Sequence, residues 1–101
     1  MNIKERNEKL AVFFEACEKI LEKKGIDYNP DGIAFSEIYG EAAALGLRPE
    51  SYMGVLMSKH WGAIKSYINT GKAASEPIHE RLKDLANYCA MMSVMIEEEK
   101  K

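Results

Sequence analysis

The sequence has no basic tract and no apolar run long enough to cross a membrane. Its net charge is −2, and without clustered lysines and arginines a nucleic-acid backbone is not expected as the main partner. The longest apolar run, YCAMMSVMI, is far shorter than the roughly 20 residues that span a bilayer. The first residues, MNIKERNEK, are polar and helical, unlike a signal peptide. We therefore expect a cytoplasmic protein with no membrane contact.

Cysteine is also scarce. Cys17 and Cys89 are the two cysteines of the chain, and they form neither a CxxC motif nor a spacing with paired histidines. Both fall on predicted apolar helix faces, which is typical of small buried side chains. A disulfide or a thiolate metal site is the alternative, and it is unusual in a reducing compartment.

No segment alternates apolar and polar residues as a strand does, and no internal repeat is visible. The 101 residues therefore predict one all-α domain over residues 1–101, a small bundle of three long helices and one short helix. The long helices are expected at residues 2–24, 49–69 and 77–99, and the short one begins at Ser36 and ends at Gly46. A chain of this size has a modest core, so we expect homo-oligomerisation to complete the bundle.

The C-terminal segment carries the strongest pattern. Apolar side chains recur there at alternating steps of four and three, which predicts a helix packed lengthwise against other helices. They are Ile78, Leu82, Leu85, Cys89, Met92 and Ile96. Tyr88, Met91 and Met95 widen this stripe on one side, and Asp84 falls about 20–40° from each of these three. A carboxylate inside an apolar arc needs a cation, a metal or strong donors as its partner.

Acidic residues at a spacing of four are candidate magnesium ligands. Glu76, Glu80 and Asp84 project along one side of the C-terminal helix. Glu37 and Glu41 lie one turn apart on the short helix. Carboxylate oxygens are the ligands that Mg²⁺ prefers. For Glu37 and Glu41 the alternative is an exposed pair of acids.

Two residues of the helix at 49–69 lie near the same site. Lys59 is at the edge of the apolar arc, where its ammonium is either exposed or a counter-ion for Asp84 or for a phosphate. His60 lies near the middle of the arc, which favours a hydrogen-bonded core residue over a ligand or a base. Gly71 and Lys72 do not form a phosphate loop, because the motif's other glycine and its Ser or Thr are missing.

Three stretches, KKGIDY, MSKHWGAIKSYINTGK and SEPIHERLKDLANYCAMM, resemble the first nucleotide modification associated domain family. Its members are small all-α proteins, common in phages and prophages and distantly similar to the MazG-like nucleotide pyrophosphohydrolases. The resemblance covers about residues 23–95. The matching positions are Glu76, Asp84, Asn87 and Tyr88 in the last stretch, and Asp27, Tyr28, Phe35 and Lys59 upstream.

The resemblance implies a MazG-like fold and a nucleotide as ligand. It implies binding or processing of that nucleotide, as by a Mg²⁺-dependent nucleoside triphosphate pyrophosphohydrolase. The nearest counterparts of the family's metal-binding pairs are Glu37 with Glu41 and Glu80 with Asp84, and Glu76 is a further candidate. By the same resemblance the phosphate would meet Lys59, and the nucleotide would contact Asp27, Asn87 and Tyr88.

The alternative function is that of a non-catalytic helical module for oligomerisation or interaction. In this hypothesis Asp84 forms a structural ion pair with Lys59. Met91, Met92 and Met95 then pack against a second copy or another partner, because methionine adapts well to such surfaces. The two hypotheses share the all-α fold and the homo-oligomer, and they differ in what Asp84 meets.

Overall fold

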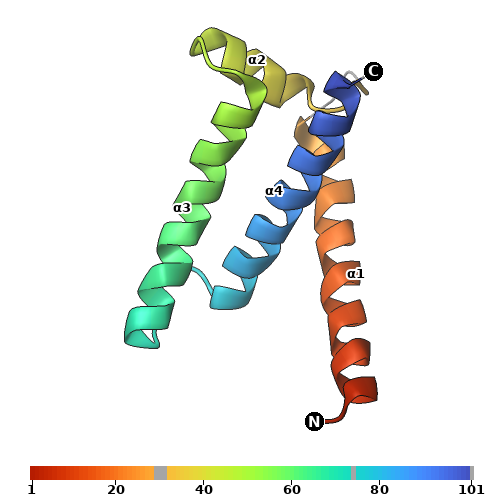
Figure 1. Cartoon of the computed structure of the whole chain (residues 1–101), viewed down its shortest axis with the longest axis vertical. Coiled ribbons are helices and arrows are strands. Elements are labelled where there is room, and N and C mark those ends of the chain that lie inside the picture. The colour runs from red at the N-terminus through yellow and green to blue at the C-terminus, as the bar shows by residue number, and fades with distance from the viewer. Residues whose placement is uncertain (29–31, 74, 101) are drawn as a thin grey trace.

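Four helices make up the described part of the chain (Figure 1). The computed structural model describes residues 1–28, 32–73 and 75–100, and of residues 26–28 only the backbone. The helices are α1 (Ile3–Tyr28), α2 (Ser36–Ala44), α3 (Pro49–Thr70) and α4 (Ile78–Glu99). No strand occurs among these residues, which confirms the predicted all-α fold with three long helices and one short one. None of the described helices is both long and apolar enough to cross a membrane.

α4 is the central helix of the bundle. α1 packs on one flank of α4 and α3 packs on the other, while α2 packs on α3 near the residue where α3 begins (Figure 1). The chain direction in Figure 1 shows that α3 runs antiparallel to α4, whereas α1 runs in the same direction as α4. A helix with two neighbours must present apolar side chains to both, so the orientation of α4 about its own axis positions the site.

Glycine ends two of the helices as predicted, but it does not end α1. Gly46 and Gly71 have φ values of 68° and 72°, in the left-handed region that terminates helices. α1 continues through Gly25 to Tyr28, so the predicted end at residue 24 is wrong. A glycine inside a helix costs only about 1 kcal/mol, which is too little to end α1 by itself.

The fully buried core is small. In the described part of the chain its apolar members are Cys17, Ala42, Met53, Ile64 and Met95. Met53 and Met95 have no exposed surface at all. The first half of α1 contributes nothing, because residues 1–12 are all exposed. The prediction of a modest core is therefore confirmed.

α4 is rotated about its axis relative to the prediction. Leu82, Cys89 and Ile96 of the predicted stripe are exposed, whereas Tyr88 is half-buried and Met95 is fully buried. The physical reason is that α3 covers the side of α4 that carries Tyr88 and Met95, and not the centre of the stripe. The prediction that Cys89 is buried is therefore wrong, and both cysteines are free thiols.

Replacing Met95 tests the importance of this contact. We expect Met95→Ala to lower the free energy of unfolding by about 2–5 kcal/mol, because it leaves a cavity between packed helices. Val12→Ala is the control, since Val12 is 67% exposed and its truncation should cost less than about 0.5 kcal/mol. Urea unfolding measures both values, and equal losses would contradict the packing described.

Candidate functional site

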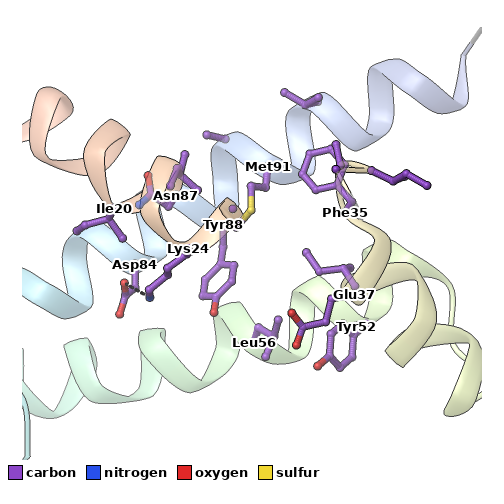
Figure 2. A pocket seen from close by; sticks show the side chains of 18 residues that line it. Ile20, Lys24, Phe35, Glu37, Tyr52, Leu56, Asp84, Asn87, Tyr88 and Met91 are labelled. Atoms are coloured by element: carbon purple, nitrogen blue, oxygen red, sulfur yellow. Dashed lines mark ion pairs between the residues drawn. The ribbon is translucent and has the colours of Figure 1, made fainter. Parts of the chain in front are cut away.

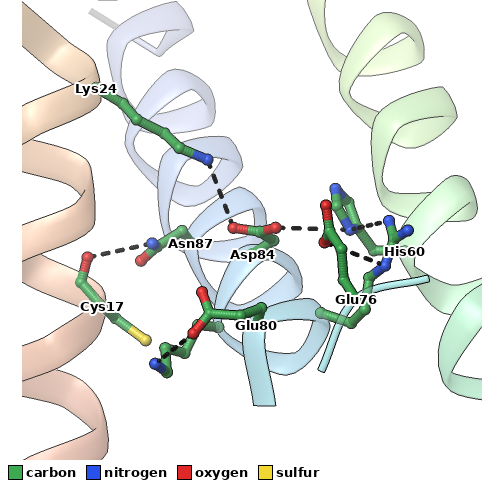
Figure 3. Close-up of polar contacts among 9 residues, drawn as sticks. Cys17, Lys24, His60, Glu76, Glu80, Asp84 and Asn87 are labelled. Carbon is green, nitrogen blue, oxygen red and sulfur yellow. Dashed lines mark hydrogen bonds and ion pairs between the residues drawn. The ribbon is translucent and has the colours of Figure 1, made fainter. Parts of the chain in front are cut away.

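Asp84 joins three helices. Its side chain is 17% exposed; Oδ1 lies 3.6 Å from Nζ of Lys24 on α1, and Oδ2 lies 3.9 Å from Nδ1 of His60 on α3 (Figure 3). The predicted pair with Lys59 is wrong: Lys59 is exposed and forms no ion pair with Asp84 among the contacts described. α1 supplies the lysine instead, and the side chain of Lys24 points toward Asp84 on α4 (Figure 3).

His60 is buried between charged groups and an aromatic ring. Arg81 Nη1 lies 3.3 Å from its Nδ1, and the ring centroid of Tyr88 lies 5.3 Å from its own. Burial lowers the pKa of His60 below its ordinary value; the Asp84 carboxylate opposes this shift, and the cations of Arg81 and Lys59 add to it. The ring is therefore neutral at pH 7, and Nδ1 can accept a hydrogen bond from Arg81 when Nε2 carries the proton.

Asn87 connects α4 to α1 through a hydrogen bond. Its Nδ2 donates to the backbone carbonyl of Cys17 over 3.1 Å, in a buried contact (Figure 3). Burial also raises the pKa of the Cys17 thiol; Lys83 lowers it and Asp84 raises it. Cys17 is thus a buried thiol, which confirms the prediction for this cysteine.

A cavity of about 710 Å³ lies beside Asp84. All four helices and residues 32–35 contribute to its wall (Figure 2). The apolar lining residues are Ile20, Leu21, Ile33, Ala34, Phe35, Ile38, Leu56, Ala90, Met91 and Val94, and the polar ones are Lys24, Glu37, Tyr52, Asp84, Asn87 and Tyr88. This volume and this mainly apolar wall with a few polar groups are typical of small-molecule sites.

Phe35 lines the cavity in a strained backbone conformation. Its φ of 63° is left-handed, which is rare for a bulky side chain and costs about 1–3 kcal/mol. Phe35 precedes the first residue of α2, and its ring packs edge-on against Tyr39 at a centroid distance of 6.3 Å. Strain of this kind gathers at ligand sites, which supports the cavity as the functional region.

The predicted magnesium ligands are not brought together. Asp84 and Glu37 line the cavity at opposite ends, with Tyr88 between them (Figure 2). The carboxylates of Glu76 and Glu80 form ion pairs with Arg81 at 3.4 Å and Lys83 at 3.0 Å. Glu41 is exposed and does not line the cavity.

These positions decide whether the acids fit a magnesium centre. Among the side chains that the structure describes, no three of the His, Cys, Asp and Glu type are grouped so that they could hold a metal ion. A centre built from facing pairs of carboxylates requires such a group. The donor set therefore does not fit this kind of centre.

Two of the three predicted nucleotide contacts lie at the cavity. Asn87 and Tyr88 line the cavity together with Asp84, while the side chain of Asp27 lies outside the described part of the chain. Lys24 is a site residue that was not predicted. Its spacing of seven from Cys17 within the predicted helix places it near the inner face of α1, and this signal could have identified it.

Comparison of this chain with protein-family models, with curated proteins and with solved structures found no match. A function for the cavity is therefore argued from its own residues and their geometry.

The buried His60 predicts a pH dependence of stability. Because its pKa is lowered in the folded protein, the unfolded chain binds more protons, and stability falls as the pH drops below the ordinary value of about 6.5. Above that value the contribution is complete. Urea unfolding at pH about 7.5 and about 5.5 should show a larger loss for the native chain than for His60→Gln. Equal losses in the two proteins would contradict the assignment.

Proposed function

We propose that this chain binds a nucleotide in the cavity beside Asp84. The observation that carries the proposal is that Asp84, Asn87 and Tyr88 line one cavity of about 710 Å³. The resemblance noted in the sequence implies a metal for Asp84 and a nucleotide for Asn87 and Tyr88. A cavity of this size admits a nucleoside with part of its phosphate chain outside.

The apolar wall suits the base. A nucleobase has two apolar faces, which pack well against aromatic rings, and a polar edge, which needs hydrogen bonds. Phe35 and Tyr88 offer rings on the cavity wall. Because Nδ2 of Asn87 donates to Cys17, its Oδ1 is left as an acceptor for an amino group of the base.

Lys24 suits the phosphates. It lies on the cavity wall, its side chain is 49% exposed, and its Nζ is 3.6 Å from Asp84. A phosphate group would compete with the Asp84 carboxylate for this ammonium, which is a compact point charge. Lys24 thus takes the role that the sequence suggested for Lys59.

Magnesium enters the proposal as the counter-ion of the phosphates. Asp84, once Lys24 turns to the phosphate, would be its protein ligand, and phosphate oxygens and water would complete the shell. The proposal is binding and not hydrolysis, because Glu76 and Glu80 are already paired with Arg81 and Lys83 and add no ligands.

A second proposal is that the chain self-associates as a helical interaction module. It is supported by the apolar side chains that the described fold leaves exposed, among them Trp61 at 47% and Ile68 at 65%. The ion pair of this hypothesis becomes Asp84–Lys24 in place of Asp84–Lys59. The two proposals are compatible, since the exposed residues named here do not line the cavity.

Lysine substitutions test the nucleotide site. Lys24→Gln should weaken binding of a nucleoside triphosphate about tenfold, or about 1.4 kcal/mol, and should leave binding of the uncharged nucleoside nearly unchanged. Lys59→Gln is the matched control and should have no effect on either ligand. Isothermal titration calorimetry with each of the common triphosphates measures this. If Lys59→Gln weakens binding and Lys24→Gln does not, the phosphate position is wrong.

Filling the cavity tests the position of the base. Ala90 lines the cavity and Ala43 on α2 does not, so Ala90→Phe should abolish nucleoside binding while Ala43→Phe preserves it. Nucleoside binding that survives Ala90→Phe would overturn the proposal.

Replacing Asp84 tests its role as a metal ligand. Asp84→Asn should weaken triphosphate binding in Mg²⁺, because removal of the carboxylate loses a metal ligand. It should not weaken binding in a chelator, because removal of the carboxylate also relieves its repulsion of the phosphates.

A further inference from the structure

One side of the α3–α4 hairpin carries exposed apolar side chains. On α4 these are Leu82, Cys89 and Ile96, at a spacing of seven, and on α3 they are Trp61 and Ile68, also seven apart. A spacing of seven places each set in one row along its helix. The two rows form an apolar surface that no other described helix covers.

The two rows lie on the same side of the hairpin. Around the axis of α4, the row lies about 120° from the face that packs on α3, which is the face of Tyr88 and Met95. Asn87 lies about 80° from the same face, in the opposite direction of rotation. Around α3, Trp61 lies about 80° from the face that packs on α4, and Leu56 lies about 60° in the opposite sense. Leu56 and Asn87 line the same cavity, so these sides of α3 and α4 face the same way. The sides that carry the two apolar rows therefore also face the same way.

The row on α4 is symmetric about Cys89. Leu82 and Ile96 stand seven residues before and after it, and Leu85 and Met92 stand four before and three after. Between His79 and Glu97 no charged residue lies within about 60° of Cys89 around the helix, and one flank carries the small residues Ala86, Ala90 and Ser93. Arg81 lies about 80° from Cys89 on the other flank. A symmetric apolar row with small neighbours allows the close approach of an identical helix in the reverse direction.

We propose that a second copy of this chain covers this surface, with α4 packed antiparallel on α4 of the other copy and a two-fold axis beside Cys89. In this arrangement Leu82 of each copy faces Ile96 of the other, and the two Cys89 side chains are neighbours. The α3 helices then lie side by side, so Trp61 and Ile68 are covered too. The assembly is a four-helix bundle that extends the existing α3–α4 contact.

The charges at the ends of the row match this arrangement. At 1.5 Å rise per residue, Glu97 lies about 12 Å beyond Cys89 along the helix, and Lys83 lies about 9 Å before it. Antiparallel packing brings Glu97 of one copy within about 3 Å, along the helix axis, of the levels of Lys83 and His79 of the other, on the same flank. Lys83 also pairs with Glu80 of its own helix. Opposite charges at such positions favour this pairing over a parallel one, which would place like groups together.

This inference rests on the self-association proposed above, and it does not depend on the nucleotide. Sedimentation velocity over a concentration series tests it. Leu82→Glu should weaken the dimer at least about tenfold, because it places carboxylates in the apolar row, while Val55→Glu should not. Val55 is the control because it is 61% exposed on the part of α3 that faces neither α4 nor the row.

Charge exchange provides a variant that does not disturb the apolar row. Glu97→Lys should weaken the dimer, and adding Lys83→Glu should restore it. Circular dichroism checks that every variant keeps its helices. A native chain that remains monomeric would overturn both self-association and this surface, whereas a dimer unaffected by Leu82→Glu would overturn this surface alone.

Cross-linking tests the position of the axis. A short bis-maleimide should join two native chains through Cys89, which is exposed, and not through the buried Cys17. Cys89→Ser should abolish the cross-linked dimer and Cys17→Ser should not. Cross-linked dimer that forms at the same rate in Leu82→Glu and in the native chain would contradict the proposed packing.

Discussion

The contact on which the structure depends is the carboxylate of Asp84 between Lys24 and His60. It connects all three long helices through one half-buried group. Because α1 and α3 each pack mainly on α4 rather than on each other, this carboxylate and the Asn87–Cys17 hydrogen bond help to fix the outer helices on α4. A partly buried acid costs free energy unless it is paired, and Lys24 supplies the opposite charge because the ring of His60 is neutral.

The central position of α4 divides its surface into two kinds of site. Toward α1 and the residues before α2 lies the cavity, which combines an apolar wall with Asp84, Asn87 and Lys24. On the far side lies the apolar row around Cys89. Under the two proposals, α4 would contact a small ligand on one flank and a second copy of the chain on the other, and the small core leaves that second surface exposed.

The sequence predicted the helices well and their orientation less well. Helix ends followed from Gly46 and Gly71, whose left-handed backbone is a local property. α1 continues through Gly25 because a glycine in a helix costs only about 1 kcal/mol. Leu82 and Cys89 looked buried because periodicity shows which residues share a face, but not which of two apolar faces meets a neighbour.

Only part of the site was predicted, because spacing along one helix shows nothing about contacts between helices. Asp84, Asn87 and Tyr88 share one helix, so their proximity could be read from spacing. The partners of Asp84 come from α1 and α3, whose positions depend on how the helices cross, and no local pattern encodes that. Glu80 was expected to ligate a metal, but it stands within reach of Lys83 one turn away and pairs with it.

The most direct test of the central claim is a two-dimensional ¹H–¹⁵N spectrum of the native chain, titrated with one nucleoside triphosphate at a time in Mg²⁺. The account predicts that the largest shifts fall on the side-chain amide of Asn87 and on the backbone amides of Lys24, Phe35 and Tyr88, which surround the cavity. Shifts confined to exposed residues far from Asp84, or no shifts with any of the triphosphates, would contradict it.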